Sequence, residues 1–538
     1  MSDIASDPVT NEVVRSALTY ACEEMGIALR NAAYSPNIKE RLDHSCALFD
    51  RRGRMIAQAE HIPVHLGSLP WGLHETLRAI AARGERVEPG EQWVVNDPYV
   101  AGTHLNDVTL IRPVFAGDGS TARLVGYAAN KAHHTDVGGK VPGSISTDAR
   151  ELCEEGLILP PLRLVRGDAL VAEIVALVRA NSRTPAARSG DLTAQVAANV
   201  IGERRVLEVL ERYGESVFEA AIEASLDASD VLLQAALRRL GDGEVRVEEV
   251  LEPPDGGDLL RLVARVRLAG GAMSVDYAGT HAQVPYPLNA VFGVTLSGVH
   301  YALRCMTGDD IPMNDGCFRA VTVSAPEGCL LNPRRPAPVG GGNVETSQRN
   351  ADLLFRAFAE LAPGRVPAQS AGTMANVMAG GERAGGVIWA LYETIGGGMG
   401  ARPGADGIDG IHTHMTNTLN TPVEALERSA PIRVTRYEFA EGSGGDGEFR
   451  GGCGLVRGFT LTEGTATFSL LAERHRVAPE GAAGGKPGAR GAHALRRAGG
   501  EAESLPAKCS VELRAGDEIV VQTPGGGGYG APARRNAD

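Results

Sequence analysis

Asn96-Asp-Pro-Tyr-Val-Ala-Gly-Thr-His-Leu-Asn-Asp107 is the stretch of this 538-residue sequence that decides the fold prediction. It contains a turn over 98–102 and lies between two apolar runs, near 91–96 and 108–115, that are typical of strands. A third apolar run near 122–130 leads into His133-His-Thr-Asp136. The pattern predicts three consecutive strands whose loops carry histidine and aspartate, the kind of place where functional groups are often found.

The sequence on either side of these strands alternates between helical and extended patterns. Residues 9–33 have apolar side chains at helical spacing, and a hairpin follows over 46–57. A charge-laced helical pattern runs from about 170 to 240, and its periodicity is explained by packing over one side of a core. Further expected elements are a helix at 68–84, strands within 244–277, a helix at 288–306, a strand at 319–324, a helix at 346–361, and strands at 454–461 and 466–472.

These elements predict a multi-part mixed fold of the α+β class. We expect a metal-bearing α/β region over 1–165, a helical region over 166–243, an α/β core region over 244–430 and a β-rich region over 431–538. Glycine is abundant, with 68 residues, and it clusters at places such as Gly525–Gly528. The clusters indicate tight turns and close approaches of the backbone in the C-terminal region.

Charge and cysteine content exclude several classes of protein. The net charge of −13 disfavours a nucleic-acid-binding protein, which usually presents a basic face. The 8 cysteines form no Cys-x-x-Cys pair, and so few thiols in a long chain are typical of a reducing compartment. The first residues lack the pattern of a signal peptide, and no apolar run approaches the length of about 18 residues expected for a membrane span. We therefore expect a cytoplasmic, soluble protein that binds neither nucleic acid nor membrane.

Two short clusters combine an imidazole with a carboxylate three residues further on, His104 with Asp107 and His133 with Asp136. Nitrogen and oxygen donors in this mixture suit Mn²⁺, Zn²⁺ or Fe²⁺ better than Ca²⁺ or a thiolate metal site. Asp43, just before the predicted hairpin, could complete a set of two histidines and two carboxylates with His104, Asp107 and His133. Such a set leaves a coordination position open for a water, so metal-activated water is the leading chemical hypothesis.

The aspartates also have purely structural explanations. Asp43 could cap the turn before its strand, and Asp107 could accept hydrogen bonds from its own loop. His134 and Asp136 are candidates for catalytic roles beside the metal, either orienting a ligand or taking a proton from bound water.

Two further motifs are weaker. His61 and His65 have the spacing of a helical zinc pair, but Pro63 between them argues against a helix interior. No phosphate-binding Gly-x-x-x-x-Gly-Lys-[Ser/Thr] loop occurs, and Gly484-Gly-Lys-Pro487 has proline where the magnesium-binding hydroxyl should stand. We predict no cofactor-binding nucleotide site in this chain, so any ATP is expected to bind to another chain.

Eight stretches resemble the hydantoinase B / 5-oxoprolinase C-terminal-half family, which includes the metal-bearing subunits of ATP-dependent hydantoinases, lactamases and acetone or acetophenone carboxylases. They run in order along nearly the whole chain. The stretches are Glu40–Phe49, Glu60–Ser68, Asn96–Asp107, His133–Gly139, Gly341–Arg349, His412–Glu424, Arg450–Leu455 and Thr523–Gly530. Together they are specific for the family and much less specific for the substrate.

The resemblance implies a division of labour between two subunits. A hydantoinase A-type partner would bind ATP and phosphorylate an amide or enolate oxygen, and this chain would receive the activated species at a divalent metal. The family's ligands, carried over by motif, are Asp43, His104, Asp107 and His133. Asn343 and Glu345 are implied as substrate-binding residues, the alternative being a structurally capped helix N-terminus. The family also implies a hetero-oligomer, which we expect to be a heterotetramer.

Three hypotheses follow. The first is an ATP-dependent hydrolase subunit that opens a small cyclic amide (a hydantoin, a lactam or 5-oxoproline), with metal-bound water attacking the phosphorylated substrate. The second is the metal-bearing subunit of an acetone- or acetophenone-type carboxylase. The third is a non-catalytic scaffold for the ATP-binding partner, with structural histidine and aspartate loops. The first is preferred because hydrolases outnumber carboxylases in the family, which is an argument by analogy.

Overall fold

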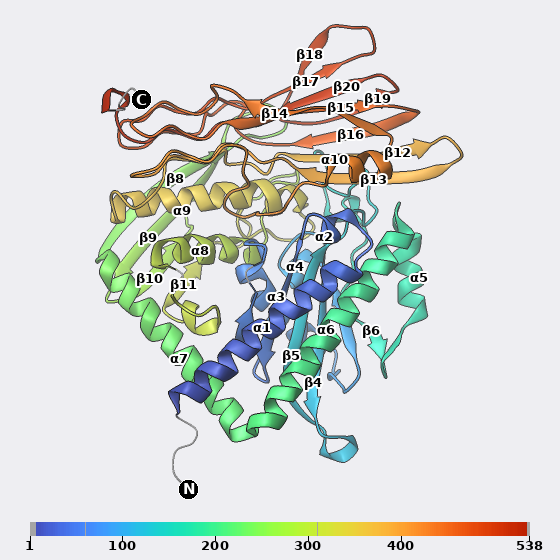
Figure 1. Cartoon of the computed structure of the whole chain (residues 1–538), viewed down its shortest axis with the longest axis vertical. Coiled ribbons are helices and arrows are strands. Elements are labelled where there is room, and N and C mark those ends of the chain that lie inside the picture. Colours follow the sequence, from blue (N-terminus) through green and yellow to red (C-terminus); the bar gives the residue numbers. More distant parts are fainter. Residues whose placement is uncertain (1–6, 60, 309, 535–538) are drawn as a thin grey trace.

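The computed structural model describes residues 7–59, 61–308 and 310–534 (Figure 1). Residues 1–6, which the signal-peptide prediction used, lie outside the described residues. Helices and strands both contribute extensively, and the predicted α+β class is confirmed. Across the described ranges, none of the helices combines the length and apolar character needed to cross a membrane.

A seven-stranded antiparallel sheet forms the N-terminal part, in the order β2-β1-β5-β4-β3-β6-β7. Three neighbouring strands of this sheet, β1, β5 and β4, have one end at the candidate site. The strands are β1 (His44–Asp50), β2 (Met55–Gln58), β3 (Gln92–Val95), β4 (Asp107–Ala116), β5 (Arg123–His133), β6 (Leu162–Arg166) and β7 (Ala169–Leu170). The hairpin and the three strands predicted around the histidine loops correspond to β1 to β5.

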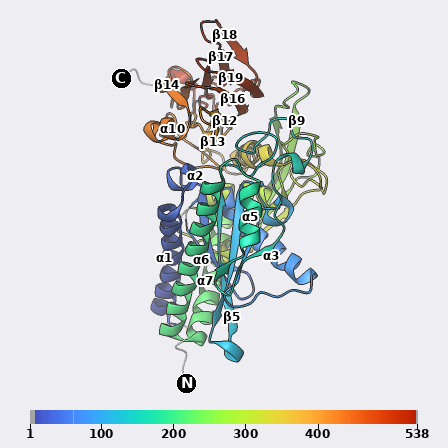
Figure 2. The same ribbon diagram turned by 90° about the vertical axis from the view of Figure 1, so that its right-hand side faces the viewer.

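Helices cover both faces of this sheet because its strands are apolar on both sides. Leu48 and Ala128 face a core shared with the long helices, whereas Phe49 and Ala129 face a second core built with α3. This alternation follows from the two-residue period of a strand. Three long helices lie side by side on the first face, as Figure 2 shows: α1 (Pro8–Ala32), α6 (Pro185–Tyr213) and α7 (Glu215–Leu240). The remaining N-terminal helices are α2 (Pro36–Lys39), α3 (His65–Ala82), α4 (Pro98–Ala101) and α5 (Ala172–Ala180).

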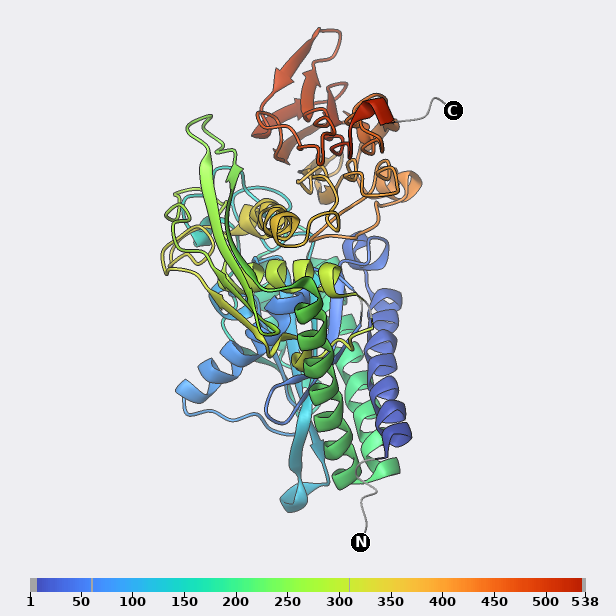
Figure 3. The same ribbon diagram turned by 90° about the vertical axis from the view of Figure 1, so that its left-hand side faces the viewer.

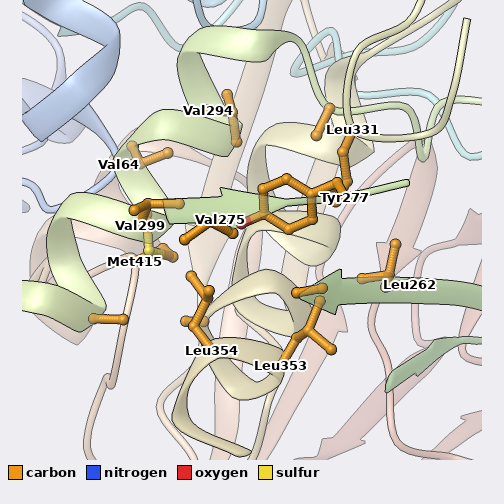
Figure 4. Close-up of a cluster of buried hydrophobic side chains, with 14 of the residues drawn as sticks. Val64, Leu262, Val275, Tyr277, Val294, Val299, Leu331, Leu353, Leu354 and Met415 are labelled. Carbon is orange, nitrogen blue, oxygen red and sulfur yellow. The ribbon is translucent and has the colours of Figure 1, made fainter. Parts of the chain in front are cut away.

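A second sheet has the order β11-β10-β9-β8 and shares its core with α8, α9 and the C-terminal end of α7. Leu262, Val275 and Tyr277 meet Leu353 and Leu354 of α9 in the core of this part (Figure 4). The same core includes Val64 and Met415, which also line the candidate site. The elements are β8 (Gly243–Leu251), β9 (Leu260–Ala269), β10 (Ala272–Asp276), α8 (Phe292–Thr307), β11 (Val321–Ser324) and α9 (Ser347–Leu361).

The C-terminal part is a sandwich of two sheets, seen at the top of Figure 3. One sheet has the order β13-β12-β16-β19 and the other β14-β15-β20-β17-β18, and Phe459 of the second meets Phe468 of the first. The elements are β12 (Asn376–Arg383), β13 (Val387–Thr394), α10 (Val423–Ser429), β14 (Ile432–Ala440), β15 (Gly454–Leu461), β16 (Thr465–Leu471), β17 (Ala492–Arg496), β18 (Ala502–Leu505), β19 (Lys508–Arg514) and β20 (Glu518–Gln522).

Three strands of the sandwich, β12, β13 and β14, were not predicted. β12 contains Gly380 and Gly381, which weaken a strand pattern, and most of β14 is exposed on both faces and so shows no alternation. The sandwich also takes strands from both sides of residue 430. The four-region division of the chain stays a prediction.

Candidate metal centre

Strand register brings the predicted donor residues together at one end of the N-terminal sheet. Asp107 is the first residue of β4 and pairs directly with His133, the last residue of β5. Asp43 comes just before β1, where its carbonyl accepts a hydrogen bond from the His133 backbone N–H. Adjacent strands lie about 4.8 Å apart, so three neighbouring strand ends can present side chains to one point.

His104 reaches the same point from a short loop. Helix α4 ends at Gly102, which has a φ of 84° and therefore turns the chain in the left-handed region. Buried Lys131 of β5 donates hydrogen bonds from Nζ to the Ala101 carbonyl (2.8 Å) and to Thr103 Oγ1 (3.0 Å). These contacts hold the loop that carries His104 against the sheet. A buried lysine near the end of a mostly apolar strand is a sequence signal for such a positioning role, and the prediction did not use it.

The donor atoms of His104, Asp107 and His133 converge. His104 Nε2 lies 3.0 Å from Asp107 Oδ1 and 3.2 Å from His133 Nδ1, and His133 Nδ1 lies 3.3 Å from the same Asp107 oxygen. Two donors that share one ion at about 2.1 Å are separated by roughly 3.0–3.4 Å, so these distances suit a common cation. The three side chains are buried, and they form a possible metal site.

Two further residues stand at the edge of this group. Asp43 Oδ2 lies 4.0 Å from His133 Nδ1, and His65 Nε2 lies 3.5 Å from Asp107 Oδ2. Neither His65 Nε2 nor Asp107 Oδ2 has a well-formed hydrogen bond in the described part of the chain. Buried polar atoms without partners are rare, and here both are metal-donor types. The residues present therefore fit a divalent cation.

The electrostatics of the cluster favour an ionised Asp107. Burial alone would raise the pKa of its carboxyl group, but the charge and hydrogen bond of His104, with further contacts from His133 and His65, hold that pKa well below its usual value. Burial raises the pKa of Asp43 and lowers the pKa of His133. A neutral imidazole beside a carboxylate is the protonation state that binds a metal.

The cavity at the cluster has a volume of only about 20 Å³. That is room for one ion or one water. Besides the donors, its wall includes apolar side chains such as Val64 and Met415, together with Tyr392 and the polar residues Thr394 and Thr416. The Tyr392 ring stacks on His133 with 4.4 Å between ring centroids, and its hydroxyl donates to Asn376 Oδ1 at 2.9 Å.

The other predicted site residues lie at different distances from this cavity. Asn343 lines it, from the π-helical turn Gly342–Thr346 that precedes α9. Glu345 lies one layer behind, where its Oε1 accepts a hydrogen bond from Asn376 Nδ2 at 2.7 Å. Asn376 in turn accepts a hydrogen bond from Tyr392, so Glu345 is connected to the site through two side chains. Its role as a substrate contact stays a prediction.

His134 and Asp136 are not brought to the cluster. His134 faces α6, where its Nε2 lies 2.9 Å from Gln195 Oε1, because neighbouring residues at a strand end point to opposite faces. The Asp136 carboxylate is occupied by Arg183, which donates from its backbone N–H (2.9 Å) and from Nη1 (3.0 Å). The predicted catalytic roles of the two residues stay untested.

His65 and Tyr392 line the site but were not among the predicted site residues, although His65 was considered as part of a helical zinc pair. The suspected His61–His65 pair does not form on a helix, because α3 begins only at His65 and Pro63 precedes it. His61 packs against His44 instead, with 5.0 Å between ring centroids. Tyr392 lies on β13, a strand for which no local signal was recognised.

Fold and site together define a class: an α+β protein with a possible His–Asp–His metal site at the ends of adjacent strands. The chain belongs to the hydantoinase B/oxoprolinase family, whose model matches residues 7–532. The family prediction made from the sequence motifs is therefore confirmed.

Several relatives match almost the whole chain. MJ0963 of Methanocaldococcus jannaschii is 45% identical over 98% of this chain and 92% of its own length. The 5-oxoprolinase 1 of Arabidopsis thaliana is 35% identical over 99% of this chain, which spans only 42% of that longer protein. A Pseudomonas protein whose name makes it one subunit of a D-/L-hydantoinase is 32% identical, covering 99% of this chain and 91% of its own length.

Two solved structures share the fold. The ATP-dependent caprolactamase from Pseudomonas jessenii has a TM-score of 0.90 and 32% identity, over 99% of this chain and 92% of that one. A nucleotide-free acetone carboxylase has a TM-score of 0.90 at 19% identity, over 99% of this chain and 76% of that one. At this low identity the second match supports the fold alone.

Proposed function

We propose that this chain is the metal-dependent subunit of an ATP-dependent cyclic amide hydrolase, working with a hydantoinase A-type partner that binds ATP. The observation that carries the proposal is the convergence of His104 Nε2, Asp107 Oδ1 and His133 Nδ1 within 3.0–3.3 Å at the sheet end. The names of the relatives and of the caprolactamase structure supply the reaction class. Expected substrates are hydantoins, lactams or 5-oxoproline.

The proposed reaction consumes two waters for each ring opened. One water oxygen forms a bond to the activated carbonyl carbon, the C–N bond breaks, and the nitrogen leaves with a proton. The second water releases the phosphoryl group as inorganic phosphate, so ATP becomes ADP. A lactam or 5-oxoproline becomes an amino acid, and a hydantoin becomes a carbamoyl amino acid. An unstrained amide is a poor electrophile, which explains why its oxygen would first be phosphorylated on the partner.

The residues of this chain have distinct tasks in that scheme. Asp43, His104, Asp107 and His133 would hold a divalent cation, expected to be Mn²⁺, Zn²⁺ or Fe²⁺. A bound cation supplies a hydroxide at neutral pH, since it lowers the pKa of water from about 15.7 towards 7. Lys131 positions the His104 loop, and apolar side chains such as Val64 and Met415 exclude bulk water from the cavity.

The first test is elemental analysis of the purified chain beside His104→Ala and Asp107→Asn, with His281→Ala as the control because His281 is exposed. We expect close to one metal per chain in the wild type and the control, and loss of the metal in the two cluster variants. A wild type without metal, even after supplementation with the partner present, would refute the metal site and favour the scaffold hypothesis.

The second test is turnover. Together with the ATP-binding partner, the wild type should release an amino acid from a cyclic amide in an ATP-dependent manner, and His104→Ala should not. Product formation that instead requires bicarbonate would assign the chain to the carboxylase alternative.

A further inference from the structure

Helix α1 has a second apolar side, which faces away from the protein. Its inner side packs in the core through residues such as Leu18 and Met25. On its outer side, large apolar side chains stay exposed, and a tyrosine continues their line two residues beyond the helix. They are Val9, Val13, Tyr20, Ile27 and Tyr34, each 45–71% exposed. Single apolar residues are common on surfaces, but a row of them along one helix is typical of an interaction site.

The spacing of these residues is that of a coiled-coil seam. Val13, Tyr20 and Ile27 are seven residues apart and take position a of a heptad, and Val9 takes the preceding position d. The other d positions are polar: Ser16, Glu23 and Arg30. A seam of this kind packs against another helix. Figures 2 and 3 show α1 at the outer edge of the layer that it forms with α6 and α7, where a helix of another molecule can approach.

We propose that this seam joins two copies of the chain, with the two α1 helices packed antiparallel about a twofold axis. Reversing one helix brings each a position level with a d position of the other, and a single register aligns all of them. The level pairs are Ile27 with Ser16, Tyr20 with Glu23, and Val13 with Arg30 of the second copy. The Tyr20 hydroxyl can then donate to Glu23, and the apolar stem of Arg30 can cover Val13.

The charges along α1 favour the antiparallel orientation over the parallel one. Glu12 precedes Val13 near the start of the helix, and Arg30 lies in its last turn. Antiparallel packing brings Arg30 of one copy towards Glu12 of the other. Glu12 already pairs with Arg15 on its own helix, and a carboxylate has acceptor sites for both arginines. Parallel packing in register would instead place Arg30 beside Arg30, and like charges across an interface are unfavourable.

The shape of the molecule suits the same orientation. The sandwich lies beyond the C-terminal end of α1 (Figures 2 and 3), so the antiparallel pair places the two sandwiches at opposite ends of the dimer. The 25 residues of α1 give a contact about 37 Å long. Val200 of α6 is exposed one turn from Arg204, which borders Glu24 of α1, and it widens the apolar surface. A twofold contact closes on itself and stops at two copies.

Sedimentation velocity of the purified full chain over a series of concentrations tests the dimer. We expect a concentration-dependent dimer for the wild type. Tyr20→Glu and Ile27→Glu should each raise its dissociation constant about 100-fold, because the twofold axis introduces each change twice and each buried anchor contributes about tenfold. Both side chains are exposed in the single chain, so the variants should melt at the wild-type temperature.

The matched control is Leu177→Glu, which places the same charge at an exposed apolar position of another helix, α5. It should dimerise like the wild type. A wild type that stays monomeric at the highest concentration would overturn the proposal. Seam variants that dimerise as tightly as the wild type and the control would overturn it as well, since the contact would then lie elsewhere.

A charge exchange tests the orientation. Arg30→Glu should weaken the dimer, and adding Glu12→Arg in the same chain should restore its dissociation constant to within a few-fold of the wild type. The restoration is expected only if residues 12 and 30 of different copies meet, as they do in the antiparallel pair. A double variant as weak as Arg30→Glu alone would refute this orientation.

The same variants distinguish a second copy from the ATP-binding partner as the occupant of the seam. Mixed with that subunit, Tyr20→Glu should still form the complex, because the seam is used between copies of this chain. A wild type that is monomeric alone, together with a Tyr20→Glu chain that no longer binds the ATP-binding subunit, would assign the seam to that subunit and overturn the proposal. These measurements need no turnover, so they stand even if the proposed reaction does not occur.

Discussion

Glu345 is a fully buried carboxyl group whose protonation the structure determines. Its Oε1 accepts hydrogen bonds from the Met374 N–H (3.2 Å) and from Asn376 Nδ2 (2.7 Å), whereas Oε2 has no partner in the described part of the chain. Burial, reinforced by the charge of Glu473, raises the pKa of Glu345 from 4.5 to about 8. The folded protein therefore holds this group protonated at neutral pH, while the unfolded chain ionises it.

Because the pKa of Glu345 is raised in the folded state, its contribution to the free energy of unfolding decreases as the pH rises. Between pH 4.5 and 8 the folded state binds more protons than the unfolded state, so the contribution of Glu345 is full below pH 4.5 and is lost as the pH rises towards 8. At 1.36 kcal/mol per unit, the loss is about 3 kcal/mol at pH 7 and below about 1 kcal/mol at pH 5. Glu345→Gln keeps the shape and the accepting oxygen and removes the titration. We expect the variant to be more stable than the wild type by about 3 kcal/mol at pH 7.

Urea unfolding at pH 5 and pH 7, followed by tryptophan fluorescence, measures this difference. Glu360→Gln, at an exposed position of α9, is the matched control and should show no such gain. A Glu345→Gln variant that is less stable at pH 7, or a difference that is the same at both pH values, would refute the argument. A loss of ring opening in a variant that remains stable would support the predicted substrate contact.

Three further substitutions have effects whose direction the structure predicts. His65→Ala should weaken metal binding about 10- to 100-fold in a chelator competition, since His65 lies beside Asp107. An unchanged metal affinity would show that His65 does not contribute to metal binding. Burial lowers the pKa of His493 to about 3, so its contribution is present above pH 6.5 and is lost on acidification towards pH 3. His493→Leu should thus shrink the stability difference between pH 7.5 and pH 5 by about 2 kcal/mol in urea unfolding, and an unaltered difference would contradict this. Gly398→Ala should lower the melting temperature in calorimetry, because a Cβ atom there would overlap backbone atoms of Gly452 and Gly526, at a cost of roughly 1–3 kcal/mol or more; an unchanged melting temperature would show that the backbone can shift.

Local patterns were sufficient for much of the N-terminal part. Helix α1 and strands β3 to β5 correspond to the predicted segments within a few residues, because their apolar spacing is regular and turn residues bound them. Strands β12 and β14 escaped prediction, because paired glycines interrupt the first and exposure on both faces removes alternation from the second. Strand β12 depends on pairing with β16, where Asn376 lies opposite Leu471. Strand β14 is an edge strand that, among the described strands, pairs only with the next one, β15.

At the candidate site, too, one part could be predicted from the sequence and another part depended on the tertiary structure. His104 and Asp107 could be chosen from one loop, and their side chains do meet at 3.0 Å. The sequence could not tell that Asp136, at the same spacing from His133, points elsewhere and pairs with Arg183. Strand register decides this, because Asp107 lies opposite His133 in the β4–β5 pair, whereas Asp136 lies beyond the end of β5.

The sequence by itself determined the family, the α+β class and the chemical types of the donors, because motifs and apolar periodicity are local properties of the chain. Tertiary structure alone decided which donors converge, and it placed His65 and Tyr392 at the site. The physical reason is that a binding site depends on the distances between atoms that are far apart in the sequence. A cation needs several donor atoms within a few ångströms of one point, and only strand pairing and the packing of distant segments set those separations.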